Sequence, residues 1–118
     1  MATLPTNIEM IDAIVCVSDL SRAVRYYTNV LGFDPPMWTT DDFTSVSLAG
    51  HGIYLAQRQQ GQPGSWIWVG VGDVRALHDL SAERGAIIRM PPTNCPWALK
   101  LHVEDPDGNV LRFGSDPD

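Results

Sequence analysis

The sequence predicts an α+β protein of two βαβββ modules, whose curved mixed sheets carry their helices on the outer side. Three observations support this fold class. Short β-prone segments at 14–20 and 67–74 both end in Val, one further residue, Asp and an apolar residue. A helical pattern follows each segment and ends in glycine, at Gly32 and at Gly85. The two aspartates lie about half the chain apart, which indicates an internal repeat.

The first module is expected to start with the β-prone segment at 14–20, in which Asp19 caps the helix that follows, because its carboxylate can accept N–H groups of the first turn. The apolar face of this helix has i, i+3, i+4 and i+7 spacing and consists of Leu20, Ala23, Val24, Tyr27 and Leu31. Strands are predicted at 43–48 and 53–56, on either side of a turn at Gly50-His51-Gly52.

The second module repeats this order with the strand Ser65-Trp-Ile-Trp-Val and a helix that follows Asp73. The residues of this helix predicted to face inward are Val74, Leu77 and Leu80. The remaining strands are predicted at 86–90, where Pro91-Pro92 ends the strand, at 98–103, and at 110–113 after the turn Asp105-Pro-Asp-Gly-Asn. We predict a single domain over 1–118, with module one at about 8–58 and module two at about 64–115.

The composition is that of a globular and acidic protein, with 44% hydrophobic and 19% charged residues. Lys and Arg number 8 against 14 Asp and Glu, which gives a net charge of −6. The only lysine is Lys100, and no basic cluster is visible in the sequence. This argues against nucleic-acid binding, which needs cationic side chains on phosphates, and favours cationic or neutral partners.

The expected location is the cytoplasm, away from membranes. No apolar run is long enough to span a bilayer, and the first residues lack the pattern of a signal peptide. Cys16 and Cys95 are expected to be free thiols, and a disulfide between them is the alternative.

No metal or nucleophile motif stands out. The histidines His51, His78 and His102 share no ligand spacing, and solvated or core positions are expected for them. Cys16 lies in the middle of a predicted strand, as a packing residue would. The sequence therefore provides no catalytic set, and no cofactor is expected.

The aromatic residues give the strongest functional signal. Trp66 and Trp68 are two apart on a strand and project from the same face, where two indoles form a flat apolar wall. The alternative is a core position, which we favour for Trp68 but not for Trp66. Trp38 and Trp97 lie in predicted loops, where contact surface is expected. An aromatic groove with an acidic rim would suit a planar cation.

The motif set resembles the vicinal oxygen chelate superfamily, which includes glyoxalase I, extradiol dioxygenases, fosfomycin-resistance enzymes and bleomycin-resistance proteins. The resemblance rests on the two-module order, on Val17-Ser-Asp-Leu, on Tyr26-Tyr with Leu31-Gly-Phe, and on the closing Asp105-Pro-Asp-Gly-Asn-Val-Leu-Arg-Phe. It covers nearly the whole chain. It implies the glyoxalase/bleomycin-resistance fold.

The superfamily's metal enzymes have ligands at three recognisable points, and this chain differs at all three. The resemblance places Asp12 and Trp66 at the two histidine positions and Arg112 at the glutamate position. A tryptophan cannot ligate a hard divalent cation, and an arginine repels one. The comparison of positions therefore implies a scaffold without the metal site.

The chain is most similar to the bleomycin-resistance branch, through Asp41-Asp42-Phe43, through Trp66-Ile-Trp-Val and through Pro96-Trp97. Proteins of that branch are homodimers that sequester a large basic antibiotic at the dimer interface without catalysis. The ligand-binding residues that this resemblance and the aromatic pattern predict are Trp38, Asp41, Asp42, Phe43, Trp66, Trp68, Trp97 and Arg112. The chain has Ala13 where the branch often has a proline at which the strand exchanges between subunits, and Ala98 where glycine is common.

The leading hypothesis is thus a metal-free homodimer that sequesters a bleomycin-type or other planar cationic antibiotic. One alternative is a metal-dependent lyase, transferase or dioxygenase that uses unexpected ligands such as Asp12, His102 or Glu104. Another is a structural or stress-related domain without a small ligand, for which a filled concave face is expected.

Overall fold

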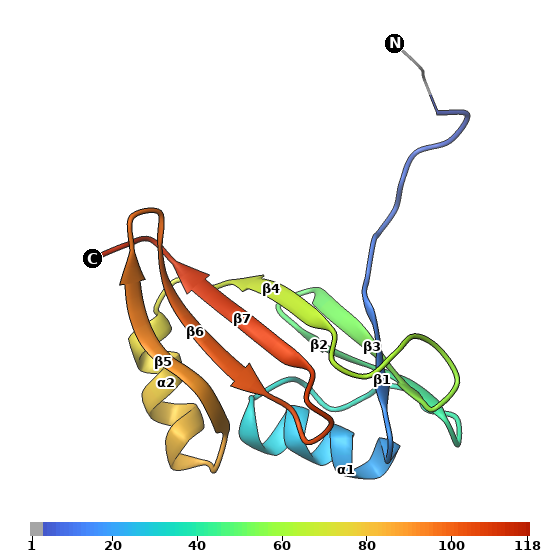
Figure 1. The fold of residues 1–118 in the computed structure, drawn as a ribbon. Coiled ribbons are helices and arrows are strands. Elements are labelled where there is room, and N and C mark those ends of the chain that lie inside the picture. Colours follow the sequence, from blue (N-terminus) through green and yellow to red (C-terminus); the bar gives the residue numbers. More distant parts are fainter. Residues whose placement is uncertain (1–3) are drawn as a thin grey trace.

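A computed structural model describes residues 4–118 and contains two β-sheets, each with a helix against it. In Figure 1 both helices lie on one side of the sheets, and the segment before the first strand runs away from the rest of the chain. The sheet orders are β1-β3-β2 and β4-β7-β6-β5. The elements are β1 (Ile14–Val17), α1 (Leu20–Arg25), a π-helical turn η1 (Tyr26–Val30), β2 (Phe43–Leu48), β3 (His51–Gln57), β4 (Trp66–Gly70), α2 (Val74–Glu83), β5 (Ile87–Cys95), β6 (Ala98–Glu104) and β7 (Val110–Ser115). The predicted α+β class is confirmed.

The first module has one strand fewer than the βαβββ order predicts. Between η1 and β2, the chain contacts the sheet through isolated bridges, Asp34 with Ser47 and Thr39 with Thr44. Pro35 and Pro36 follow Asp34 directly. Because proline has no N–H to donate to a ladder, the pairing at Asp34 does not extend beyond its single bridge. The first sheet therefore has three strands.

Helix α1 begins where the sequence predicts, because Oδ1 of Asp19 accepts a hydrogen bond from the N–H of Arg22 at 3.0 Å. It then widens into η1, which differs from the uniform α-helix that we expected. Adjacent Tyr26 and Tyr27 are consequently both buried, although the 3.6-residue spacing predicts only Tyr27 on the apolar face. Burial raises the pKa of both phenols, and nearby carboxylates add to the rise.

Helix α2 is capped by Asp73, whose Oδ1 accepts from the N–H of Ala76 at 3.0 Å. Val74 is fully buried, but Leu80 is 45% exposed, so its predicted inward position is wrong. Ser81 is buried in its place. The reason is helical geometry: Ser81 is seven residues after Val74 and returns to the same face, whereas Leu80 is six residues after it and does not.

Strand β5 does not end at Pro91-Pro92, as predicted, but continues to Cys95. It is an edge strand, and its pairing with β6 is irregular between Ile88 and Met90 and again between Met90 and Thr93. Edge strands tolerate prolines because one side of the strand needs no ladder hydrogen bond. The longer hairpin carries Trp97 in the turn between β5 and β6.

Asn109 connects the two sheets from the predicted turn before β7. Its side chain is fully buried; Oδ1 accepts from the N–H groups of Gly64 and Ser65, and Nδ2 donates to the carbonyl of Cys16 on β1. Nδ2 also donates to the buried Asp105 carboxylate at 2.8 Å. This single amide therefore fixes β1 relative to the start of β4.

Two further expectations concern the cysteines and the membrane. Cys16 and Cys95 are both free, so the disulfide alternative is wrong. Within residues 4–118, every helix is too short or too polar to cross a membrane.

Candidate functional site

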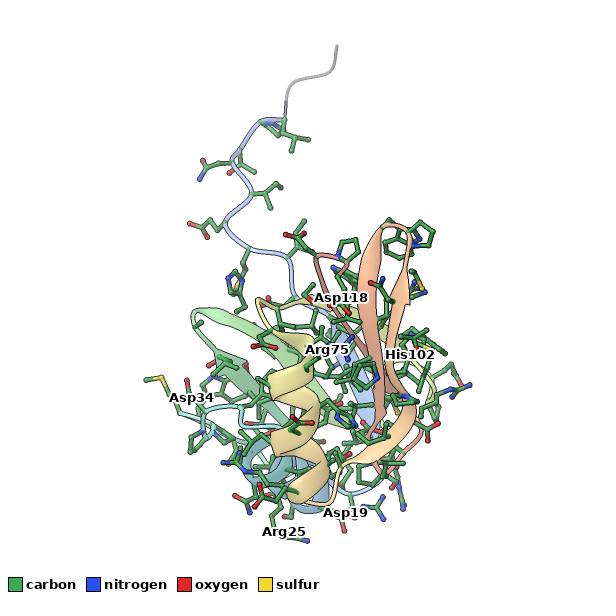
Figure 2. All side chains as sticks on the ribbon, turned by 90° about the vertical axis from the view of Figure 1, so that its left-hand side faces the viewer. Asp19, Arg25, Asp34, Arg75, His102 and Asp118 are labelled. Atoms are coloured by element: carbon green, nitrogen blue, oxygen red, sulfur yellow. The ribbon has the colours of Figure 1, made fainter. Side chains whose placement is uncertain are left out.

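The second sheet has an open face on the side away from the core. On β6, Leu101 and Val103 are fully buried, while the alternate residues Lys100 and His102 point to the other side. Register pairs His102 with Arg112 on β7, which in turn pairs with Trp68 on β4. Figure 2 labels His102 on this sheet and shows Arg75 of α2 near Asp118. The open face thus combines side chains from three strands that are distant in sequence.

The predicted tryptophans lie on this face and are not core residues. Trp66 and Trp68 are 53% and 52% exposed, and Trp97 is 61% exposed. The core position that we favoured for Trp68 is therefore wrong. The indole centroids of Trp68 and Trp97 are 6.1 Å apart with their planes at 36°. Two strand positions and one hairpin turn thus form a common aromatic wall.

Cationic side chains are placed among these indoles. The guanidinium of Arg112 lies 5.6 Å from the ring centroid of Trp68 and 5.3 Å from that of Trp97. The ammonium of Lys100 lies 5.0 Å from the Trp97 centroid. All three distances are in the range of cation–π attraction. We call this set, with His102 and Trp66, the Trp–Arg cluster.

Trp66 occupies the other end of the cluster. Its ring meets the imidazole of His102 edge-on, with centroids 5.1 Å apart and planes at 88°. The guanidinium of Arg89 lies 5.1 Å from the Trp66 centroid and pairs with the Glu104 carboxylate at 3.0 Å. The Glu104 carboxylate beside the cluster is thus already paired with a cation.

Gly114 on β7 gives the Trp68 ring its place. A Cβ atom at this position would overlap the indole, lying 2.7 Å from Cζ2. Real Cβ atoms do not approach so closely, so any other residue at 114 would displace the ring. The glycine therefore lets Trp68 lie across the surface of β7.

The electrostatics of the Trp–Arg cluster are positive, which corrects the expectation of an acidic groove around these tryptophans. Partial burial lowers the pKa of His102, and the positive charges of Arg112, Lys100 and Arg89 lower it further. The reason is strand alternation, because Lys100, His102 and Arg112 are all displayed on the one open face. The net charge of the whole chain, −6, does not reveal this local excess of positive charge.

Trp38 and Phe43 form a second aromatic group on the first sheet, together with Tyr54. The Trp38 and Phe43 centroids are 6.0 Å apart, and those of Phe43 and Tyr54 are 5.2 Å apart with planes at 15°. We call these three rings the first-sheet stack. Trp38 and Tyr54 also line a hollow that includes the acidic residues Glu9 and Asp12. Here two carboxylates lie beside the aromatic rings, whereas on the second sheet Glu104 is paired with Arg89.

The predicted acidic pair lies apart from the Trp–Arg cluster. Asp41 lines a different hollow, beside α1, together with Leu20 and Arg25. Asp42 accepts a hydrogen bond from the Thr40 hydroxyl at 3.1 Å, a local contact within its own turn. The structure therefore separates the predicted site residues into the first-sheet stack, the Trp–Arg cluster and this acidic turn.

The residues at the superfamily's metal positions do not fit a metal ion. Trp66 and Arg112 are both in the Trp–Arg cluster, where the surrounding charges are cationic, and Asp12 lines the hollow of the first sheet. Within the described part of the chain, no group of three or more His, Cys, Asp or Glu residues is placed to hold a metal. The alternative set of Asp12, His102 and Glu104 is therefore not brought together.

Comparison with known proteins now places the chain. The sequence model of the Glyoxalase/Bleomycin resistance protein/Dioxygenase superfamily matches residues 8–113. The chain belongs to this superfamily. Comparison with curated proteins gives no match.

Several solved structures have this fold, and two of the three described here are of proteins named for binding bleomycin or an antibiotic. TioX from Micromonospora sp. ML1 has a TM-score of 0.76 at 21% identity, over 91% of this chain and 99% of that one. The bleomycin-binding protein of bleomycin-producing Streptomyces verticillus, solved with copper(II)-bleomycin, has a TM-score of 0.77 at 20% identity, over 92% and 98%. TnmS3, an antibiotic-binding protein from Streptomyces sp. CB03234, has a TM-score of 0.76 at 23% identity, over 93% and 99%. These likenesses show a shared fold.

Several site residues escaped the sequence analysis, namely Tyr54, Arg89, Lys100, His102 as a neighbour of Trp66, and Gly114. One signal was available for Lys100 and His102, because the alternation of 98–103 places them opposite Leu101 and Val103. For Arg89 and Gly114 the cross-strand register was needed, and a single sequence does not provide it.

Proposed function

We propose that this protein binds and sequesters a planar aromatic molecule of the antibiotic type, without catalysis and without a metal. The observation that carries this proposal is the display of half-exposed tryptophans in contact with other aromatic or cationic side chains on both sheets, in the Trp–Arg cluster and in the first-sheet stack. Exposed aromatic side chains beside polar groups are typical of a ligand site. Two structures with the same fold are described as binding bleomycin and an antibiotic, which supports this ligand class.

We further propose that the functional unit is a homodimer with the ligand in a groove between subunits. Large apolar side chains on the open faces and in the segment before β1 support this, because such surface usually marks an interaction site. The exposed residues of that segment are Leu4, Ile8, Met10 and Ile11. A planar cation of the bleomycin type would fit the first-sheet stack, where Glu9 and Asp12 are nearby.

Tryptophan fluorescence provides the test of binding. Metal-free bleomycin, added to the purified protein, is expected to quench the fluorescence saturably. Trp38→Ala should weaken this binding, whereas Leu80→Ala, a change on the exposed side of α2, should not. The absence of saturable quenching by bleomycin and by a simple planar cation such as an acridinium would contradict the proposal.

Light scattering tests the dimer separately. A mass of about twice 13.0 kDa is expected at micromolar concentration. A monomer that still binds bleomycin would remove the dimer groove and leave the binding function in place.

A further inference from the structure

Arg112 carries a charge that the described chain does not neutralise. The ion pairs found within residues 4–118 involve Arg22, Arg75, His78 and Arg89, and none includes Arg112. Its Nε atom is buried and has no hydrogen-bond partner among the described residues. Nε2 of His102, its cross-strand neighbour, is in the same condition. Buried polar atoms without partners are uncommon in native proteins, and each calls for an explanation such as a bound ion or ligand.

The position of the guanidinium suits the recognition of an anion. The indoles of Trp68 and Trp97 lie against Arg112, which restricts its rotamers before any ligand arrives. A guanidinium is planar and always charged, and its N–H groups match the two oxygens of a carboxylate. Arg112 is therefore better prepared for a carboxylate than a freely moving surface arginine would be.

The surrounding charges favour the same ligand. Lys100 lies two residues from His102 on β6, and both face the side of the sheet that carries Arg112. Glu104, at the edge of the cluster, is paired with Arg89. A cation placed at Arg112 would be repelled by like charges, whereas an anion would be attracted by both Arg112 and Lys100.

We infer that the Trp–Arg cluster is a subsite for an aromatic carboxylate, whose ring lies against Trp68 and Trp97 while its carboxylate pairs with Arg112. The inference rests on the proposed function only for the premise that the ligand is a small aromatic molecule. It adds the sign of the ligand's charge at this sheet, which is negative and therefore opposite to that of a bleomycin-type cation. It requires neither the dimer nor the first-sheet stack.

Calorimetry with two matched probes tests the inference. Naphthalene-2-carboxylate and naphthalene-2-carboxamide share the ring and differ in charge. The carboxylate is expected to bind at least about tenfold more tightly. A hydrogen bond between charged groups contributes more free energy than a tenfold change in the binding constant requires. Arg112→Gln should abolish this preference while the amide still binds.

Arg75→Gln is the matched control. It removes the same charge from α2, where Arg75 pairs with Asp118 at the surface (Figure 2). It should keep the full preference for the carboxylate. If the preference disappears equally in both variants, it reflects net charge and not a site, and the inference is wrong.

Arg112→Lys makes the test independent of the folding of Arg112→Gln. It retains the charge and loses the planar pair of N–H groups, so the preference should fall severalfold without vanishing. Equal binding of both probes to the wild type, or no binding of either, would overturn the inference. Equal binding would leave the proposed function standing, whereas carboxylate binding without bleomycin binding would support the inference and contradict a cationic cargo.

Discussion

The two open faces of the molecule are built on similar frames and carry opposite charges. On the first sheet, the stacked rings of Trp38, Phe43 and Tyr54 lie beside a hollow that includes Glu9 and Asp12. On the second sheet, indoles alternate with cationic side chains, as defined above for the Trp–Arg cluster. In a repeated module the core positions determine the frame, while the outward residues are free to differ.

This difference teaches that net charge is a poor guide to a site. The whole chain carries −6, yet the face with the most exposed indoles is positive. A ligand could therefore be recognised by two contrasting surfaces, one for a cationic group and one for an anionic group.

The largest expected effect, on the free energy of unfolding, comes from removing the hydrogen bonds of Asn109 that connect the two sheets. Asn109→Ala removes the buried amide that reaches Gly64, Ser65, Cys16 and Asp105. We expect the free energy of unfolding to fall by about 3 kcal/mol or more, because several buried partners lose their hydrogen bonds at once. Urea unfolding measures this.

Asn94→Ala is the control for that experiment, since its side chain accepts a single exposed hydrogen bond from the N–H of Asp118. Its expected effect is within about 0.5 kcal/mol. Similar losses in the two variants would mean that the Asn109 network does not hold the sheets together.

The next effect should come from Gly114→Ala, which affects the second face alone. The new methyl group would displace the Trp68 ring, so naphthalene-2-carboxylate should bind several times more weakly. The strain should also lower stability by about 1–3 kcal/mol. Gly72→Ala is the control, because no atom lies within 4 Å of a Cβ at that position. Unchanged binding by the Gly114 variant would contradict the role of the Trp68 position.

A smaller effect is expected from replacing one tryptophan of each face by alanine. Trp38→Ala should weaken an acridinium cation about threefold to tenfold and leave the naphthalene carboxylate unchanged, because stacking contributes about 0.5–1.5 kcal/mol. Trp97→Ala should do the reverse. Calorimetry of both probes on both variants checks this, and equal losses for both probes would mean that the faces are not separate sites.

The smallest effect concerns His102. Its pKa is lowered by burial and by the cations Arg112 on β7, Lys100 on β6 and Arg89 on β5. A lowered pKa means that the unfolded state binds the proton more tightly, so this contribution to stability is complete above the ordinary pKa of about 6.5 and declines as the pH falls below it.

An NMR titration of the His102 imidazole measures that shift. Arg112→Gln should raise the pKa by removing one positive neighbour, and so should bound naphthalene-2-carboxylate. An identical pKa in the wild type and the variant would show that Arg112 does not act on His102.

Much of the fold could be predicted because its signals are local. The caps Asp19 and Asp73 lie at the starts of both helices, and the last strand follows directly after the predicted turn that ends in Asn109. The errors arose where tertiary context decides. An edge position allowed β5 to continue through Pro91-Pro92, and a missing strand in the first module followed from Pro35-Pro36.

The aromatic members of the candidate site could also be predicted, since two-residue spacing places Trp66 and Trp68 on one face. The charge of that site could not. Lys100 and Arg112 are on different strands, and only the register of β6 against β7 brings them to one face. Without that register, the acidic total was the available guide, and it pointed to the wrong sign for this sheet.

The central claim is that the exposed indoles of the second sheet bind a small aromatic ligand. The most direct test follows the indole N–H signals of the four tryptophans by NMR during a titration with naphthalene-2-carboxylate. We predict saturable shifts for Trp68 and Trp97 and almost none for Trp38 on the first sheet. Shifts that never saturate, or that are largest at Trp38, would contradict the account.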